Sequence, residues 1–183
     1  MEIGAAVSLA GLILAGGGST RMGRDKALMA LDGVTLLDRA RAVLREAGAG
    51  SVAVAGRSDV EGGFPDLRPG DGPARAAADA LLAFADAGHE LALVMPIDMP
   101  LMTASVLEPL TAAASAGAAA YERHPLPFCA RLHAPTLAGA APNSMRDLLE
   151  ALSVIWFTTE GLDPRVFTNV NTPEDWAKLT AGR

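Results

Sequence analysis

The stretch LILAGGGSTRMGRDKAL, residues 12–28, is the most informative part of this chain. It opens with an apolar run that is short enough for a buried strand. Three consecutive glycines, residues 16–18, follow this run and allow the backbone to turn sharply close to a ligand. Arg21, Arg24 and Lys26 then add three positive charges. Because successive backbone N–H groups in such a turn can surround an anion, the stretch predicts a polyphosphate-binding loop at the end of a strand.

Two well-known phosphate-binding patterns do not fit this loop. A P-loop requires a lysine and a hydroxyl residue directly after its last glycine, whereas Gly23 is followed by Arg24 and Asp25. The dinucleotide pattern G-x-G-x-x-G, counted from Gly16, would need a glycine where Arg21 stands. The alternative is a glycine-rich turn with solvated charges. The clustering of basic residues on the glycines favours the phosphate site.

Composition limits the classes to which the chain can belong. Its 183 residues are enough for one α/β domain, and we expect residues 1–183 to form a single domain. A net charge of −6 argues against general nucleic-acid binding. The single cysteine, Cys129, excludes an internal disulfide and suits a reducing compartment. The apolar start contains Glu2 and lacks a basic residue, and no apolar run approaches the ~20 residues that span a bilayer. We therefore expect a cytoplasmic protein that binds neither nucleic acid nor membranes.

Strand and helix patterns alternate along the chain. Short apolar runs bounded by turn residues predict strands, and apolar stripes with period 3.6 predict helices. The expected strands are 11–15, 51–55, 91–95, 118–121, 126–132 and 154–157, and the expected helices are 35–47, 73–87, 103–115, 144–152 and one that begins at 172. Thr35 and Thr103 are expected to cap two of these helices. Strand–helix–strand units imply parallel strands covered by helices, so the prediction is a Rossmann-like, three-layer α/β/α fold with a mostly parallel central sheet.

Asp98 follows the apolar run 91–95 and is a candidate for the same site as the glycine loop. Ligands of open α/β sheets bind outside the carboxyl ends of the strands, so both segments should face one crevice. One carboxylate together with phosphate oxygens is a normal way to hold Mg²⁺. A turn or helix-capping aspartate is the alternative interpretation.

Other polar residues have a structural and a functional interpretation. Asp66 lies in a loop rich in proline and glycine, where an aspartate often forms an Asx-type turn. His124 is a lone histidine, for which a structural role is the alternative to a ligand contact. Asn169 and Asn171 alternate, so both amides would face one side of an extended segment. Residues 172–175 are explained by helix capping alone, but the two asparagines are not.

The segment LAGGGSTRMGRDKAL resembles the signature L-A-G-G-x-S-x-R-M-G-x-D-K-A-L of the molybdenum cofactor guanylyltransferases, the MobA family of nucleotidyltransferases. The sequence N-x-N-T-P-E-D at 169–175 and the run His124-Pro125-Leu126 resemble two further segments of that family. The resemblance implies an enzyme with a nucleotidyltransferase fold that transfers GMP from GTP to molybdopterin, or to its molybdenum-bound form, and releases pyrophosphate. It implies Mg²⁺ as the cofactor. As protein partners it implies other molybdenum cofactor biosynthesis proteins and molybdoenzyme chaperones.

The resemblance also implies roles for individual residues. Arg21, Lys26 and Asp98 would be catalytic, with Asp98 as the metal ligand. His124, Asn169 and Asn171 would lie on the pterin side. The nucleotide contacts would be Leu14, Ala15, Gly16, Gly17, Gly18, Lys26, Asp66 and Asp98, with backbone N–H groups from Ala15 to Gly18 on the phosphates.

The chain departs from the family pattern in two places. The loop D-x-x-P-G-x-G-P-L-A-G is matched from Asp66 to Pro73, but Arg75 and Ala76 stand where alanine and glycine are usual. Ile97 stands where the family often has a cysteine, a change that should leave metal chemistry unaffected.

Two other functions compete with this interpretation. A cytidylyltransferase could use the same scaffold, but its first loop usually reads L-A-A-G, and Ala15-Gly16-Gly17 favours guanine because the smaller residue leaves room for a purine. A nucleotide sensor without turnover is the other. Arg21, Lys26 and Asp98 together argue against it, because binding alone does not need a metal carboxylate.

Overall fold

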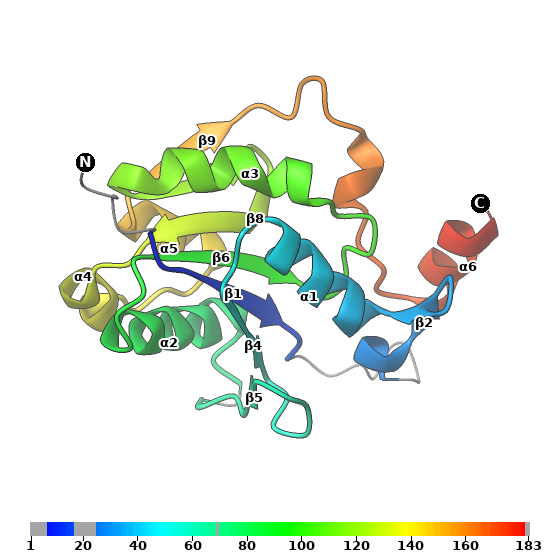
Figure 1. Ribbon diagram of the computed structural model, residues 1–183, viewed down its shortest axis with the longest axis horizontal. Helices are drawn as coiled ribbons and strands as arrows, with labels where there is room; N and C mark the ends of the chain where they lie inside the picture. Colours follow the sequence, from blue (N-terminus) through cyan, green and yellow to red (C-terminus); the bar gives the residue numbers. More distant parts are fainter. Residues whose placement is uncertain (1–6, 17–24, 69, 182–183) are drawn as a thin grey trace, which may run out of the picture.

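The computed structural model of the chain describes residues 7–16, 25–68 and 70–181. A seven-stranded sheet with the strand order β5-β4-β1-β6-β8-β7-β9 runs through its centre (Figure 1). The strands of this sheet are β1 (Leu9–Leu14), β4 (Ser51–Ala55), β5 (Gly63–Phe64), β6 (Leu91–Pro96), β7 (Ala118–Tyr121), β8 (His124–Arg131) and β9 (Val154–Phe157). Strand β8 is antiparallel to its neighbours β6 and β7, whereas the other neighbouring pairs are parallel. The predicted mostly parallel sheet is confirmed.

Helices cover both faces of the sheet, which confirms the three-layer architecture (Figure 1). Helices α1 (Leu36–Glu46) and α3 (Ala104–Ala113) pack on one face, and α2 (Pro73–Asp86), α4 (Ala134–Gly139) and α5 (Met145–Ala151) pack on the other. Successive side chains of a strand point to opposite faces, so in β1 Ile13 joins the first core and Leu12 joins the second. Within the described ranges, no helix has the length and apolar character needed to cross a membrane.

Several short elements complete the fold. They are η2 (Lys26–Leu28), the hairpin of β2 (Ala30–Leu31) and β3 (Val34–Thr35), η3 (Ala114–Ala116), η4 (Pro164–Phe167) and α6 (Pro173–Ala181). The β2–β3 hairpin, β5 and α4 were not predicted, because segments of two to six residues show no clear periodicity. Strand β8 begins two residues earlier than predicted, at His124.

The two predicted threonine caps differ in the structure. The Thr35 hydroxyl accepts the N–H of Asp38 at 3.0 Å and caps α1 as expected. Thr103 occupies the N-cap position of α3, but its hydroxyl lies 3.0 Å from that of Ser105 and makes no capping bond. The expectation for the Thr103 side chain is therefore wrong, because a neighbouring hydroxyl competes with the backbone for it.

The carboxyl ends of three parallel strands meet at one edge of the sheet, on the right of Figure 1. Leu14 of β1 pairs with Ala55 of β4 on one side and with Pro96 of β6 on the other. The segments that follow β1 and β4 then approach so closely that a Cβ on Gly56 would lie 2.3 Å from the Cα of Gly16. Gly56 also has φ +81°, so only glycine fits there without strain. This edge therefore gathers the loops that the sequence marks as functional.

Candidate active site

Three segments that are far apart in the sequence meet around Asp98. Lys26 is the first residue of η2, and its Nζ lies 3.8 Å from Oδ2 of Asp98, an ion pair longer than a hydrogen bond. The same Nζ donates to Oδ1 of Asn171 at 2.9 Å. The N–H of Val170 donates to the Asp98 carbonyl at 2.9 Å and fixes the third segment against the second. The prediction that the end of the first loop lies close to Asp98 is confirmed for Lys26.

The Asp98 carboxyl group has an unused oxygen. Its side chain is only 22% exposed, and its Oδ1 is buried without a hydrogen-bond partner among the described residues. Burial raises the pKa of Asp98, and the positive charge of Lys26 opposes this shift. No group of three His, Cys, Asp or Glu side chains in the described ranges could enclose a metal ion. A cation on Asp98 would therefore complete its coordination with water and with oxygens of a bound substrate, as Mg²⁺ commonly does.

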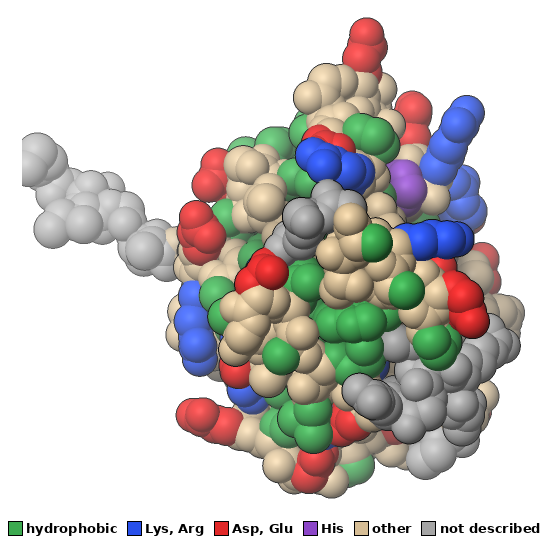
Figure 2. Space-filling view, turned by 90° about the vertical axis from the view of Figure 1, so that its right-hand side faces the viewer, with side chains coloured by type: hydrophobic (Ala, Val, Ile, Leu, Met, Phe, Trp, Pro, Cys, Tyr) green, Lys and Arg blue, Asp and Glu red, His purple; other side chains and the backbone are tan. Residues whose placement is uncertain are grey.

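A pocket of about 240 Å³ opens beside Asp98. Its polar lining consists of Asp98, Asn169, His124 and Arg123, and its apolar lining consists of Pro96, Met99, Pro125 and Leu126. The His124 ring stacks on Phe167, with ring centroids 4.2 Å apart and planes inclined by 13°. Burial and the charge of Arg123 lower the pKa of His124, so its ring is neutral near pH 7. Figure 2 shows the side of the molecule that faces right in Figure 1, where basic and acidic side chains lie among each other on the surface.

Residues 11–155 match the family model of the MobA-like NTP transferase domain. This match covers well over half of the chain. The chain belongs to the MobA-like nucleotidyltransferases.

Relatives of this MobA-like enzyme agree with that assignment. The molybdenum cofactor guanylyltransferase of Xanthomonas euvesicatoria is 39% identical to it over 92% of this chain and 93% of its own length. The crystal structure of molybdopterin-guanine dinucleotide biosynthesis protein A from Archaeoglobus fulgidus superposes with a TM-score of 0.72 at 25% identity, covering 94% of this chain and 97% of its own. The structure of 2-C-methyl-D-erythritol 4-phosphate cytidylyltransferase from Thermus thermophilus shares the fold, with a TM-score of 0.65 at 21% identity over 93% of this chain and 96% of its own. The fold alone therefore does not distinguish a guanylyltransferase from a cytidylyltransferase.

The first loop of the MobA-like enzyme is only partly described. Gly17, Gly18 and Arg21 lie outside the described residues. Leu14 is buried at the end of β1, where its carbonyl accepts the N–H of Ile97 at 3.1 Å. The residue after it, Ala15, donates its N–H to the Ala55 carbonyl at 3.1 Å. The expectation that this amide faces phosphates is wrong, because the amide still completes the ladder between the two strands.

In the segment from Asp66 to Arg75, the side chains of both end residues bind the protein's own backbone. Oδ1 of Asp66 accepts the N–H of Arg68 at 3.1 Å, which is the Asx-type turn considered as its alternative role. A nucleotide contact of Asp66 stays a prediction. Arg75, one of the residues that depart from the family loop, donates from Nη1 to the Ala140 carbonyl at 3.2 Å. This arginine thereby links α2 to the end of α4.

The two asparagines lie on two sides of Asp98. Asn169 lines the pocket with His124, whereas Asn171 binds Lys26. That both amides face one side of an extended segment stays a prediction. Sequence reasoning missed Arg123, Phe167 and Arg57. Arg57 directly follows Gly56 at the carboxyl end of β4. The rule that ligands bind outside the carboxyl ends of the strands, which identified Asp98, would also have found Arg57.

Proposed function

We propose that this MobA-like enzyme transfers GMP from GTP to the terminal phosphate of molybdopterin, or of its molybdenum-bound form, and releases pyrophosphate with the help of Mg²⁺. The observation that carries the proposal is the pairing of Lys26 with Asp98 at 3.8 Å, at the carboxyl ends of the parallel strands. An ammonium group and a half-buried carboxylate at this edge provide a contact for phosphates and a ligand for a divalent cation.

The nucleotide side of the reaction depends on alignment and on charge neutralisation. Lys26 would exchange its bond to Asn171 for a phosphate oxygen and stabilise the negative charge that develops on pyrophosphate. Asp98 would hold Mg²⁺ through its carboxylate, and its Oδ1, which has no hydrogen-bond partner in the part of the chain that the structure describes, fits that role. The cation, when bound, neutralises phosphate charge. Residues 14–18, Arg21 and Asp66 are proposed as further contacts to GTP.

The acceptor side is proposed to be the pocket next to Asp98. His124, Asn169 and Asn171 would contact the pterin, and the Arg123 guanidinium is suited to the phosphate of the acceptor. A phosphate monoester has its second pKa near 6, so it is largely ionised at pH 7 and needs no strong general base to attack the α-phosphorus of GTP. The neutral His124 ring is consistent with a binding role.

The proposal extends to the setting of the enzyme. We infer that residues 1–183 act as one domain in the cytoplasm. Other molybdenum cofactor biosynthesis proteins and molybdoenzyme chaperones would supply the acceptor and receive the product.

The test is pyrophosphate release with Mg²⁺ and molybdopterin, measured separately with GTP, CTP and ATP. We expect GTP to support turnover at least about tenfold better than the other two, and mass spectrometry to detect the guanine dinucleotide of molybdopterin. A preference for CTP would make the protein a cytidylyltransferase. Nucleotide binding without pyrophosphate release under any condition would favour a sensor.

A further inference from the structure

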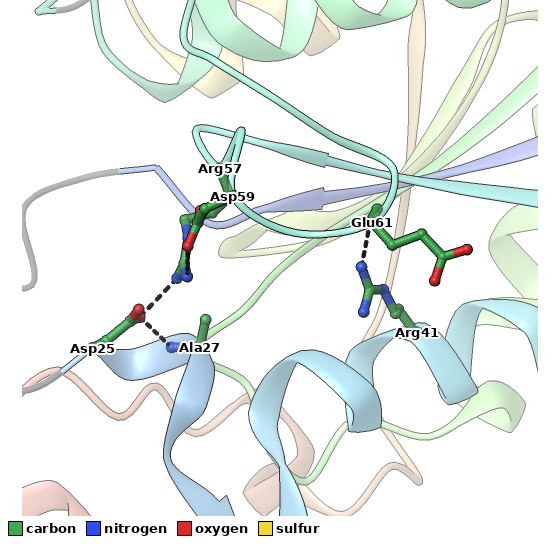
Figure 3. A network of polar contacts seen from close by, with 6 residues as sticks. All are labelled: Asp25, Ala27, Arg41, Arg57, Asp59 and Glu61. Carbon is green, nitrogen blue, oxygen red and sulfur yellow. Dashed lines mark hydrogen bonds and ion pairs between the residues drawn. The ribbon is translucent and has the colours of Figure 1, made fainter.

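Arg57 joins the segment after β4 to the segment after β1 (Figure 3). Its Nη1 donates to Oδ1 of Asp25 at 2.7 Å, and its Nε and Nη2 donate to the two carboxylate oxygens of Asp59 at 2.8 Å each. The Arg57 side chain is 13% exposed, whereas that of Asp59 is 66% exposed. Because a bidentate pair fixes the plane of the guanidinium, Asp59 orients Arg57 toward Asp25.

The charges in this network persist near neutral pH. The hydrogen bonds from Asp59 and Asp25 raise the pKa of Arg57, despite its burial. The hydrogen bonds of Arg57 lower the pKa of Asp59 to about 2. The arginine is therefore held in one orientation across the pH range in which an enzyme of this class would be assayed.

Asp25 transmits this orientation to η2. Its Oδ1, the atom that accepts from Arg57, also accepts the N–H of Ala27 at 3.0 Å and caps η2. The first residue of η2 is Lys26, whose Nζ reaches Asn171 at 2.9 Å and Asp98 at 3.8 Å. One carboxylate oxygen thus connects the partly exposed Arg57 with the turn that carries the candidate catalytic lysine.

A second arginine, Arg41, contacts the same loop and serves as a comparison. Arg41 of α1 donates to the carbonyl of Glu61 (Figure 3). It also pairs with Asp38 at 3.6 Å. Both arginines therefore hold residues 57–61, but the partners of Arg41 are in this loop and in α1, whereas Arg57 reaches the segment that carries Lys26. If a variant acted only by loosening residues 57–61, substitution of either arginine would change the orientation of Lys26 equally.

We propose that Arg57 is a positioning residue for Lys26, which acts through Asp25 and the cap of η2 to hold the lysine ammonium in the site. The role in turnover depends on the proposed function. The structural link from Arg57 through Asp25 to Lys26 can be tested without it.

The direct test uses lysine reactivity. The chain contains two lysines, Lys26 and Lys178, so acylation by an amine-reactive reagent, quantified for each site by mass spectrometry, compares Lys26 with a built-in reference. We expect Arg57→Ala to raise the ratio of Lys26 to Lys178 labelling on the order of tenfold, as for the loss of one hydrogen bond to a charged group. Arg41→Ala should leave the ratio unchanged. Arg57→Lys, which keeps the charge but loses the fork of donors, should give an intermediate ratio.

Two outcomes of the labelling experiment would overturn the proposal. One is an unchanged ratio in folded Arg57→Ala protein. The other is an equal rise in Arg41→Ala, which would mean that the loop matters and the contact to Asp25 does not. If Arg57→Ala fails to fold, Asp25→Asn takes its place, because it weakens the ion pair with Arg57 and keeps an amide oxygen that can cap η2, with a rise in the ratio expected and an unchanged ratio as the contradicting result.

Kinetics give a second readout once turnover is established. We expect Arg57→Ala to lower kcat about tenfold in the parent enzyme and less than about twofold in a Lys26→Ala background, because residues that act through one another are not additive. Equal losses in both backgrounds would contradict positioning. If the parent enzyme shows no nucleotidyl transfer at all, the proposed function fails, and the labelling result still decides the role of Arg57.

Discussion

The two sides of the site use different parts of the sheet and different chemistry. On the nucleotide side, β4, β1 and β6 are parallel and end together, and ion pairs join the segments that follow them. On the acceptor side, β7 and β8 form an antiparallel hairpin, whose turn brings Arg123 and His124 to the same pocket as Asp98. That turn is supported by ring stacking on Phe167. Strand ends thus position the charges on the nucleotide side, and a hairpin positions those on the acceptor side. Asp98 follows β6, the strand that lies between the parallel strands and the hairpin.

Removing the shared carboxylate should have the largest effect on this two-sided arrangement. We expect Asp98→Asn to lower turnover on the order of 1,000-fold, because the ligand for the cation is lost while the shape of the side chain is kept. The measurement is pyrophosphate release as a function of Mg²⁺ concentration, with circular dichroism as the check on folding. A variant that responds to Mg²⁺ as the parent does would mean that another residue holds the metal.

The second prediction concerns the nucleotide side alone. Lys26→Ala should lower kcat about 100-fold, the size of effect seen when one charge-stabilising donor is lost. Lys178→Ala is the matched control, since Lys178 is the only other lysine in the sequence and lines a different pocket from Asp98. Steady-state kinetics with GTP decide the matter. An unchanged kcat for Lys26→Ala would remove this residue from the catalytic site.

The third prediction addresses the acceptor side. Arg123→Ala should raise the KM for molybdopterin about tenfold, as expected for the loss of one hydrogen bond between charged groups, and leave the KM for GTP unchanged. Arg131→Ala is the control, because Arg131 lies at the far end of β8 and pairs with Glu90 at 3.7 Å. If Arg123→Ala raises the KM for GTP instead, GTP rather than molybdopterin occupies the pocket that Arg123 lines.

The smallest effect is expected where β8 enters the core. Burial raises the pKa of the Cys129 thiol to about 12, so almost no thiolate is present at pH 8 and the reactive form gains population only as the pH rises toward that value. Native protein at pH 8 should therefore resist alkylation by iodoacetamide until denaturant is added, and Arg123→Ala should not change this. Equal alkylation rates in native and denatured protein would show that the acceptor side is not anchored in the core.

Local signals explain how much of the fold could be predicted. The strands 51–55 and 154–157 have the predicted bounds, because each is a short run of strand-forming residues between turn residues. Strand β5 and the antiparallel pairing of β8 with β6 depend on partners outside their own segments, so no local pattern indicates them. A two-residue strand such as β5 is defined by its neighbour alone.

The site was predictable where one general rule applied. The position of ligands at strand ends led to Lys26 and Asp98, whose side chains meet. The same rule gives no orientation for individual amides, which is why the N–H of Ala15 was assigned to phosphates although it binds Ala55. The rule would also have led to Arg57, which was missed because charged loop residues are usually solvated, but its contact with Asp25 is visible only in the folded chain.

The central claim is that Asp98 and the phosphates of GTP share one divalent cation. Electron paramagnetic resonance of Mn²⁺, titrated with and without GTP into the parent enzyme and Asp98→Asn, tests it most directly. The account predicts protein-bound Mn²⁺ in the parent enzyme that requires GTP and is lost in the variant. Equal GTP-dependent binding of Mn²⁺ by the two folded proteins would contradict it.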